Sequence, residues 1–136
     1  MIIQPYIFFA GRCEEALGLY RTALGAEVSM MMRFKESPEP HPPEMVPPGW
    51  EEKIMHASFT VGESTLMASD GCPGEMAFQG FSLSIAVRDE AAAHRAFDAL
   101  AEGGEVRMPL TKTFWSPCFG MVADRFGLGW MINVVA

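Results

Sequence analysis

The first half of the chain switches between the two hydrophobic periods that distinguish helices from strands. Residues 13–24 place their apolar side chains at helical spacing, and Gly25 follows as a stop signal. The apolar runs on either side of this helix have strand length, and a tight turn at Gly62 and Glu63 joins the last two. The predicted strands are residues 2–9, 27–34, 54–61 and 64–69. This half therefore predicts the element order βαβββ.

The second half repeats the same order. Asp89 is well placed to cap a helix whose apolar stripe consists of Ala93, Ala96, Phe97 and Leu100, and a pair of glycines ends that helix. The predicted strands are residues 81–87, 105–108, 118–123 and 128–135. The chain thus contains the βαβββ pattern twice.

An internal repeat of this kind is typical of two modules that pair their sheets, each covering the apolar face that the other leaves open. We predict one α+β domain, residues 1–136, built from two paired βαβββ modules at residues 1–70 and 78–136. A ferredoxin-like βαββαβ sandwich with extra strands is the competing arrangement.

Residues 35–52 interrupt the first module. They hold six of the ten prolines together with several acidic residues, which is incompatible with a ladder strand or a helix interior. We expect a long mobile loop that serves as a lid or a dimer contact, or that recruits a partner protein.

Charge and composition exclude several classes of function. The net charge of -7, with no cluster of Lys or Arg longer than a pair, lacks the positive surface that nucleic acid binding needs. Residues 1–11 have no basic segment before their apolar residues, so they predict a first strand and not a signal peptide. No apolar run is long enough to span a membrane. Three widely spaced cysteines indicate neither a disulfide framework nor a zinc cluster, and we expect reduced thiols in a soluble, cytoplasmic protein.

Alternate positions along the predicted strands separate a dry face from a face with small and polar side chains. In the third strand, Ala57 and Phe59 belong to a wholly apolar set that we expect under a helix, whereas His56 and Ser58 belong to a mixed set. The mixed sets indicate a partly hydrated ligand pocket. Its predicted members on the strands are Gln4, Tyr6, Phe8, His56, Ser58, Met67, Ser82, Met131 and Asn133. Trp115, in the loop before the seventh strand, either closes over a bound ligand or fills the core.

Few residues offer catalytic chemistry. His56 is the only histidine on a predicted pocket face and is a candidate general acid or base, although a structural histidine satisfied by Ser58 or the backbone is the alternative. Asp70 either pairs with His56 or caps the turn at Gly71. Cys118 has no base or cation beside it in the sequence, which favours a buried structural thiol over a nucleophile. The candidate catalytic residues are therefore His56 and Asp70.

A family resemblance rests on three stretches, PYIFFAGRCEEALGLYRTALGAEV, MHASFTVGESTLMASD and TFWSPCFGMVADRFGLGWMINVV. They resemble the PhnB-like family of the vicinal oxygen chelate superfamily, which includes glyoxalases, bleomycin-resistance proteins and dihydroxybiphenyl dioxygenases. The resemblance covers nearly the whole chain outside the proline-rich loop, and the WMINVV ending is its most specific part. It implies paired βαβββ modules whose mixed sheet curves into a cup, usually within a homodimer.

The resemblance also implies four metal-ligand positions, which in metal-using relatives hold His or Gln, Glu, His and Glu. In this chain they fall at Gln4 or Pro5, at Met67 or Ala68, at Ser82 and at Met131. One amide oxygen is a feeble ligand, and the other side chains are poor ligands for a hard divalent ion. We therefore expect a pocket without a metal ion or another cofactor, in which Asn133 orients a ligand by hydrogen bonding.

Some proteins that resemble this chain carry a demethylubiquinone methyltransferase label. A methyltransferase of the usual kind needs a glycine-rich loop after its first parallel strand, and here Gly11 stands alone, so we do not expect that activity. The prediction is a PhnB-like, homodimeric protein of undetermined specific activity that binds a small organic ligand. The alternative is a metal-dependent lyase, isomerase or dioxygenase that holds a divalent metal through non-standard ligands such as His56, Asp70 and a residue from the partner chain of the dimer. The sequence identifies neither the ligand nor a reaction, and it leaves open whether the dimer completes the pocket.

Overall fold

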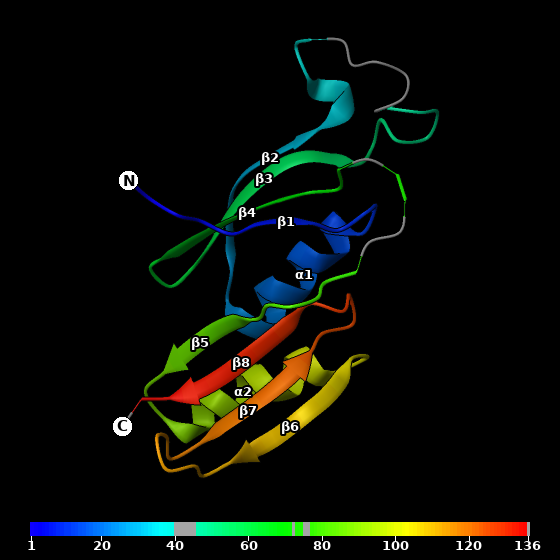
Figure 1. The fold of residues 1–136 in the computed structure, drawn as a ribbon. Coiled ribbons are helices and arrows are strands. Elements are labelled where there is room, and N and C mark those ends of the chain that lie inside the picture. Colours follow the sequence, from blue (N-terminus) through cyan, green and yellow to red (C-terminus); the bar gives the residue numbers. More distant parts are fainter. Residues whose placement is uncertain (40–45, 72, 75–76, 136) are drawn as a thin grey trace. The chain divides into compact units, whose positions relative to one another are not determined.

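The computed structural model describes residues 1–39, 46–71, 73–74 and 77–135. The chain divides into two units, Met1–Met76 and Ala77–Ala136 (Figure 1). The predicted modules, residues 1–70 and 78–136, fall within these two units. Among the described residues, each unit combines one 12-residue helix with one four-stranded sheet.

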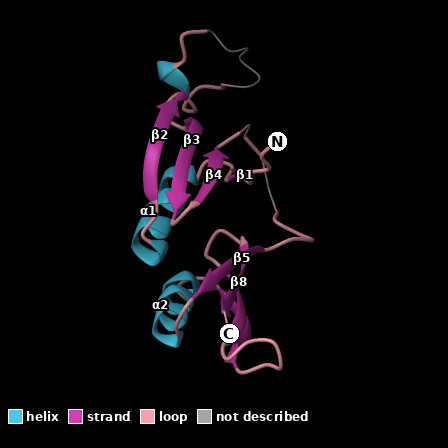
Figure 2. Cartoon of the chain, turned by 90° about the vertical axis from the view of Figure 1, so that its left-hand side faces the viewer, coloured by secondary structure: helices cyan, strands magenta, loops and turns pink. Residues whose placement is uncertain are grey.

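The first unit packs a helix against one face of a mixed sheet (Figure 2). Its elements are β1 (Tyr6–Phe8), α1 (Cys13–Leu24), β2 (Glu27–Arg33), the 3-10 turn η1 (Phe34–Glu36), β3 (Ile54–Val61) and β4 (Ser64–Ser69). The strand order is β1-β4-β3-β2, in which β1 and β4 are parallel and the other neighbours antiparallel. Tyr20 of α1 stacks on Phe59 of β3, with ring centroids 6.1 Å apart. The helix ends at Gly25, whose φ of 67° is the left-handed conformation that glycine adopts without a Cβ penalty.

The second unit has the same topology. Its elements are β5 (Leu83–Val87), α2 (Glu90–Ala101), β6 (Glu105–Thr111), β7 (Phe119–Ala123) and β8 (Gly129–Val134), in the strand order β5-β8-β7-β6. Asp89 caps α2 by accepting a hydrogen bond of 2.7 Å from Ala92 N–H, as predicted. Gly120 of β7 faces the helix, because a Cβ placed there would lie 2.9 Å from the ring of Phe97. The buried residues Ala93, Phe97 and Leu100 therefore pack on that face of the sheet.

The predicted fold class is confirmed. Each unit has the order βαβββ, and each sheet is open, which is compatible with the cup-shaped fold. The ferredoxin-like alternative is wrong, because three strands and not two follow the helix in each unit. No helix in the described part of the chain is long and apolar enough to cross a membrane.

Three predicted strands differ from the structure by two residues or more at one end. β1 is shorter than the predicted 2–9, because Pro5 has no N–H to give to the ladder, and Gln4 therefore lies before the strand with its side chain exposed. Ser82 likewise precedes β5 and does not belong to it. β6 is longer than predicted and runs through Pro109, which is tolerated because β6 is an edge strand.

Part of the proline-rich loop, residues 40–45 with His41, lies outside the described residues, so the predicted mobility and role of the loop stay untested. The end of the loop that is described is well connected. The indole N–H of Trp50 donates to the Gly71 carbonyl at 2.9 Å, and its ring lies 3.2 Å from the position that a Cβ on Gly11 would take. The β1–α1 connection and the segment after β4 thus both hold Trp50 in place.

Candidate ligand-binding site

The face of the first sheet opposite α1 is partly exposed and carries most of the predicted pocket residues of this unit. We call it the open face of unit 1, and it consists of Tyr6, Phe8, Met30, Met32, His56, Ser58 and Met67. Tyr6 pairs with Met67, and Met67 with Ser58, so these side chains share one face. Tyr6 and Phe8 are 40% and 41% exposed. The open face is therefore mainly aromatic and thioether in character.

A hydrogen-bonded pair lies on this open face. The Tyr6 hydroxyl and His56 Nδ1 are 2.9 Å apart, and the two rings are 5.6 Å apart between centroids. Ser58 Oγ lies 3.4 Å from His56 Nε2, a long contact. Phe8 lies against Tyr6, with centroids 5.1 Å apart. The structure thus brings together Tyr6, Phe8, His56 and Ser58, all predicted members of the pocket.

The environment keeps the Tyr6 hydroxyl protonated. Partial burial raises the pKa of Tyr6 above its ordinary value of 10.0, against a smaller lowering by the hydroxyl of Ser69. A phenol that keeps its proton can donate to His56 Nδ1. When Nδ1 accepts this bond, the neutral imidazole carries its proton on Nε2. The Nε2–H can then donate to Ser58 or to a ligand. The general acid or base role of His56 stays a prediction.

Asp70 has a structural position. It is 1% exposed, and its carboxylate accepts three backbone N–H groups at 2.8 Å each, from Gly11, Cys13 and Ile54. Asp70 lies directly after β4, and its carboxylate thereby accepts free backbone N–H groups at the start of α1. This helix has no side-chain cap of its own. Within the described part of the chain, the Asp70 carboxylate bonds neither to His56 nor to Gly71, whose N–H donates to Ser69 Oγ. Asp70 therefore joins the β1–α1 connection to the start of β3.

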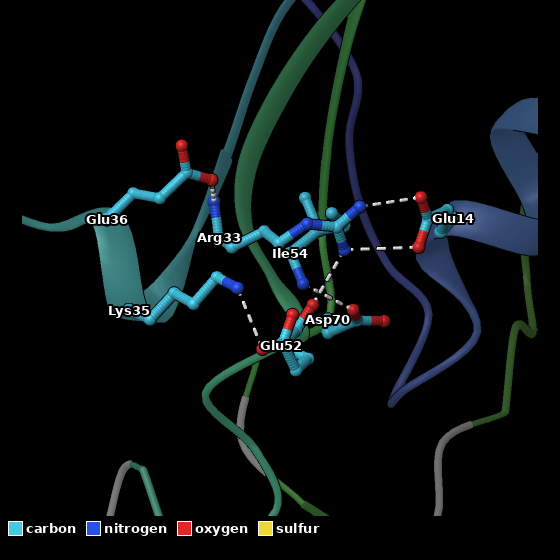
Figure 3. Close-up of polar contacts among 7 residues, drawn as sticks. All are labelled: Glu14, Arg33, Lys35, Glu36, Glu52, Ile54 and Asp70. Carbon is cyan, nitrogen blue, oxygen red and sulfur yellow. Dashed lines mark hydrogen bonds and ion pairs between the residues drawn. The ribbon is translucent and has the colours of Figure 1, made fainter.

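A charged cleft of about 510 Å³ lies next to Asp70 and the first turn of α1. Figure 3 shows the ion pairs beside it, Arg33 with Glu14 and Lys35 with Glu52. Arg33 donates to both carboxylate oxygens of Glu14, at 2.7 and 3.1 Å, and to the Glu52 carbonyl at 2.7 Å. The hydrogen bond from Arg33 lowers the pKa of Glu14. Lys35 pairs with the Glu52 carboxylate at 2.8 Å, and this bond lowers the pKa of Glu52. These charged groups are thus already paired with one another. The pairs beside the cleft connect α1 with β2 and with the loop before β3.

The second sheet also has a face opposite its helix. Because Gly120 faces α2, Phe119 and Met121 of β7 face the other way, and register places Asn133 beside Phe119 and Met131 beside Met121. We call this the open face of unit 2, and it also includes Ser84 and Ala86 of β5. The Asn133 Oδ1 atom is buried and has no hydrogen-bond partner among the described residues. Met131 and Asn133 thus share one face, as predicted, whereas Ser82 lies before the strand.

Trp115 lies over the open face of unit 2. Its ring is 5.3 Å from that of Phe119 in an edge-to-face arrangement, and it remains 49% exposed. Phe114 contacts it at 4.8 Å and is 98% exposed. Trp115 is therefore not a core residue, and the prediction that its ring lines a ligand site stays open.

Neither described cysteine has the environment of a nucleophile. Burial raises the pKa of the Cys118 thiol, and Glu90 adds to this. Burial raises the pKa of Cys13 strongly, and the charges of Asp70 and Glu14 act in the same direction. Both thiols are protonated at neutral pH, which agrees with the structural role expected for Cys118.

The residues present do not fit the divalent metal that the resemblance implies. Gln4 is exposed and precedes β1, Ser82 precedes β5, and the strand positions hold the thioethers of Met67 and Met131. Among the described residues, no three His, Cys, Asp or Glu side chains lie close enough together to hold a metal ion. Hard divalent ions need several oxygen or nitrogen donors, which this set does not supply.

Two features of the site were missed from the sequence. Met30 and Met32 join the open face of unit 1 because irregular pairing after Val28 shifts the alternation of β2. Ser116, buried in the loop before β7, donates to the Val134 carbonyl at 2.7 Å and fixes the loop that holds Trp115. No local pattern marks either feature, since each depends on a partner strand.

Comparison with protein families matches residues 2–133 to the family described as 3-demethylubiquinone-9 3-methyltransferase. Protein YjdN of Escherichia coli (strain K12) is 38% identical over 141 residues, which cover 99% of this chain and 96% of that protein. Its name specifies no activity.

Solved structures show the same similarity. Protein PA1353 from Pseudomonas aeruginosa is 45% identical with a TM-score of 0.87, and the match covers 99% of this chain and 98% of that one. A putative 3-demethylubiquinone-9 3-methyltransferase, PhnB protein, from Bacillus cereus is 27% identical with a TM-score of 0.81, over 99% and 100% of the two chains. A glyoxylase/bleomycin resistance protein/dioxygenase domain from Frankia sp. EAN1pec, at 11% identity and a TM-score of 0.67 over 100% and 98%, shares the fold.

Proposed function

We propose that this chain, which belongs to the PhnB-like 3-demethylubiquinone-9 3-methyltransferase family and has the glyoxalase/bleomycin resistance/dioxygenase fold, binds a small organic molecule on the open face of unit 1. The observation that carries the proposal is the 2.9 Å bond between Tyr6 and His56 within a partly exposed surface that is mainly aromatic and thioether in character. A few placed polar groups among aromatic and apolar side chains are the usual composition of a small-molecule site.

The polar pair gives the ligand a defined orientation. With the Tyr6 proton on the bond to Nδ1, the Nε2–H of His56 is available to a carbonyl or phenolate oxygen of the ligand, since its contact to Ser58 is long at 3.4 Å. Phe8, Met30 and Met67 supply apolar contact around it, and the flexible thioethers adapt to ligands of different shape.

The description of the family names a methyl transfer, which we do not propose for this chain. Only Gly11 follows β1 closely, without the glycine-rich loop that cradles a nucleotide cofactor. The sheet of each unit contains one parallel pair, β1 with β4 and β5 with β8, and not a series of parallel strands. The proposal therefore concerns binding.

We also infer a homodimer and a cytoplasmic location. Support for the homodimer is the exposure of large apolar side chains outside the open face of unit 1, including Phe114 at 98% and Phe81 at 51%. Support for the location is that the described cysteines, Cys13 and Cys118, are free thiols. Sedimentation velocity should give twice the chain mass of 15.0 kDa, and a single species at 15.0 kDa would contradict the dimer.

The binding proposal is tested with the fluorescent aromatic probe 8-anilinonaphthalene-1-sulfonate. We expect saturable binding that Phe8→Ala and Met30→Ala each weaken about tenfold, because both side chains lie on the open face. The matched control is Met31→Ala, since Met31 is the next residue of β2, is similarly exposed at 37% against 42% for Met30, and points to the opposite face. Equal effects of the two methionine variants, or binding without saturation, would refute the proposal.

A further inference from the structure

We propose that Trp50 is a positioning residue for the ligand site on the open face of unit 1, and that it acts on Phe8 through the backbone of Gly71. The inference rests on the proposed small-molecule function and adds to it a residue from outside the open face. Trp50 lies in the segment before β3, at the described end of the proline-rich loop. This end of the loop thereby helps to set the affinity of the site for aromatic ligands.

The first observation is the close approach of Phe8 to Gly71. A Cβ placed on Gly71 would lie 2.9 Å from Cδ1 of the Phe8 ring, so the ring rests directly on the glycine backbone. Any side chain at position 71 would push the ring away, and the φ of 62° there is one that glycine adopts without penalty. The orientation of Phe8 on the open face therefore depends on where the Gly71 peptide lies.

The second observation is that both polar groups of Gly71 are bonded. Its N–H donates to Ser69 Oγ at 2.9 Å, which is a local bond at the end of β4. Its carbonyl accepts the indole N–H of Trp50 at 2.9 Å, from a residue 21 positions earlier in the chain. Without the indole bond, the carbonyl would be free to turn while the N–H stayed in place. Trp50 therefore fixes the side of the peptide that the local bond does not hold.

The third observation is that Trp50 is itself held at its backbone and its ring. Its N–H donates to the Pro47 carbonyl at 3.0 Å, and its carbonyl accepts the N–H of Lys53 at 3.0 Å. The ring lies 3.2 Å from the Cβ position of Gly11, whose carbonyl accepts the Lys53 ammonium at 2.9 Å. A donor that is fixed in this way can position the group to which it bonds. A site that is ordered before the ligand arrives loses less entropy on binding.

Phe8 connects this arrangement to the polar pair of the site. Its ring centroid lies 5.1 Å from that of Tyr6, and the Tyr6 hydroxyl lies 2.9 Å from His56 Nδ1. Aromatic pairs have preferred geometries, so a Phe8 ring that leaves Gly71 also changes the support of Tyr6. Loss of the Trp50 bond should therefore weaken ligand binding although every side chain of the open face is still present.

A double-mutant cycle with 8-anilinonaphthalene-1-sulfonate tests the proposal. Trp50→Phe removes the indole N–H and keeps an aromatic ring, and we expect it to weaken the probe about fivefold, the usual effect of one hydrogen bond. In a Phe8→Ala background, where the residue that transmits the effect is absent, Trp50→Phe should weaken the probe no further. The matched control is Trp130→Phe, which loses an indole bond of the same length, to Asp124 in the second unit, and should leave the affinity unchanged.

A second measurement uses the parent protein. Coupling between two sites is reciprocal, so saturating probe should slow hydrogen exchange of the Trp50 indole N–H by the same factor, about fivefold. The signal is identified in 1H–15N spectra by its absence from Trp50→Phe. Unchanged exchange would overturn the proposal. A double variant weakened about fiftyfold would also overturn it, because Trp50 would then act independently of Phe8.

The unliganded protein separates this inference from the binding proposal. Trp50→Phe should shift the ring signals of Phe8 and Tyr6 in 1H–13C spectra without any probe, whereas Trp130→Phe should not. If these signals shift but the probe does not saturate, the binding proposal fails while the positioning of Phe8 by Trp50 stands. If the probe saturates with equal affinity on the parent and on Trp50→Phe, only the positioning role fails.

Discussion

The clearest test of how unit 1 is held together is the substitution Asp70→Asn. The carboxylate accepts N–H groups of Gly11 and Cys13 on one oxygen and of Ile54 on the other, each at 2.8 Å. The amide keeps the shape but turns one acceptor into an NH2 donor. The expected result is that the oxygen still serves two N–H groups and that the third is left facing a donor.

The magnitude follows from the number of bonds. Hydrogen bonds to a charged group contribute about 1.5–3 kcal/mol, and a buried group left unpaired costs about 1–3 kcal/mol. Asp70→Asn should therefore lower the free energy of unfolding by about 2–4 kcal/mol. Asp70→Ala removes all three bonds and should cost about 3–9 kcal/mol, a large part of the roughly 5–15 kcal/mol available to a domain.

Urea unfolding measures this loss. If the slope of the unfolding free energy against urea concentration is unchanged, a lower urea midpoint reports the lower stability. Asp89→Asn is the matched control, because Asp89 caps α2 through one exposed bond and asparagine caps a helix about as well as aspartate. The control should stay within about 0.5 kcal/mol of the parent. If the two substitutions lowered stability by the same small amount, the hydrogen bonds from Asp70 to the β1–α1 connection and to β3 would not stabilise unit 1 as their geometry indicates.

Three further predictions concern the ion pair, the orphaned oxygen and the helix-facing glycine. The bond from Arg33 lowers the Glu14 pKa below its ordinary value of 4.5, so the stabilisation is complete above that value and is lost as the pH falls through the folded-state pKa. The urea concentration at the unfolding midpoint should therefore fall as the pH is lowered below about 5, and Arg33→Gln should flatten this dependence, whereas an unchanged slope would exclude the pair. Asn133→Leu should raise the free energy of unfolding of the unliganded protein by about 1–3 kcal/mol in urea titrations, because a buried acceptor without a partner is removed, and a loss of stability would show that the oxygen has a partner. Gly120→Ala should lower the thermal midpoint by the equivalent of about 1–3 kcal/mol, since the new methyl group would lie 2.9 Å from the Phe97 ring, and an unchanged midpoint would refute this packing.

Local periodicity was sufficient for most of the fold. The boundaries of α1, β3 and β4 agree with the predicted 13–24, 54–61 and 64–69, because hydrophobic spacing and a flanking glycine or turn act within the segment itself. The sheet face to which each side chain points was harder to predict. Alternation placed His56 and Ser58 correctly together, but it missed Met30 and Met32, since a bulge in β2 is decided by pairing with β3.

The polar contacts of the candidate site depend on residues far apart in the sequence. Asp70 bonds to groups 59, 57 and 16 positions away, and Tyr6 meets His56 across 50 residues. A single sequence contains no signal for such partners when they are backbone N–H groups, because every residue but proline has one. This is why the sequence indicated His56 and Asn133 as polar positions on the right faces but not the role of Asp70.

The tryptophans of the chain occupy three different environments. Trp50 bonds to a backbone carbonyl in the first unit, Trp130 is 3% exposed and donates to Asp124 at 2.9 Å in the second, and Trp115 is half in solvent. Variants that retain one indole at a time would emit from one unit only. Intrinsic emission would then reveal, without any label, whether the duplicated halves melt together or one after the other.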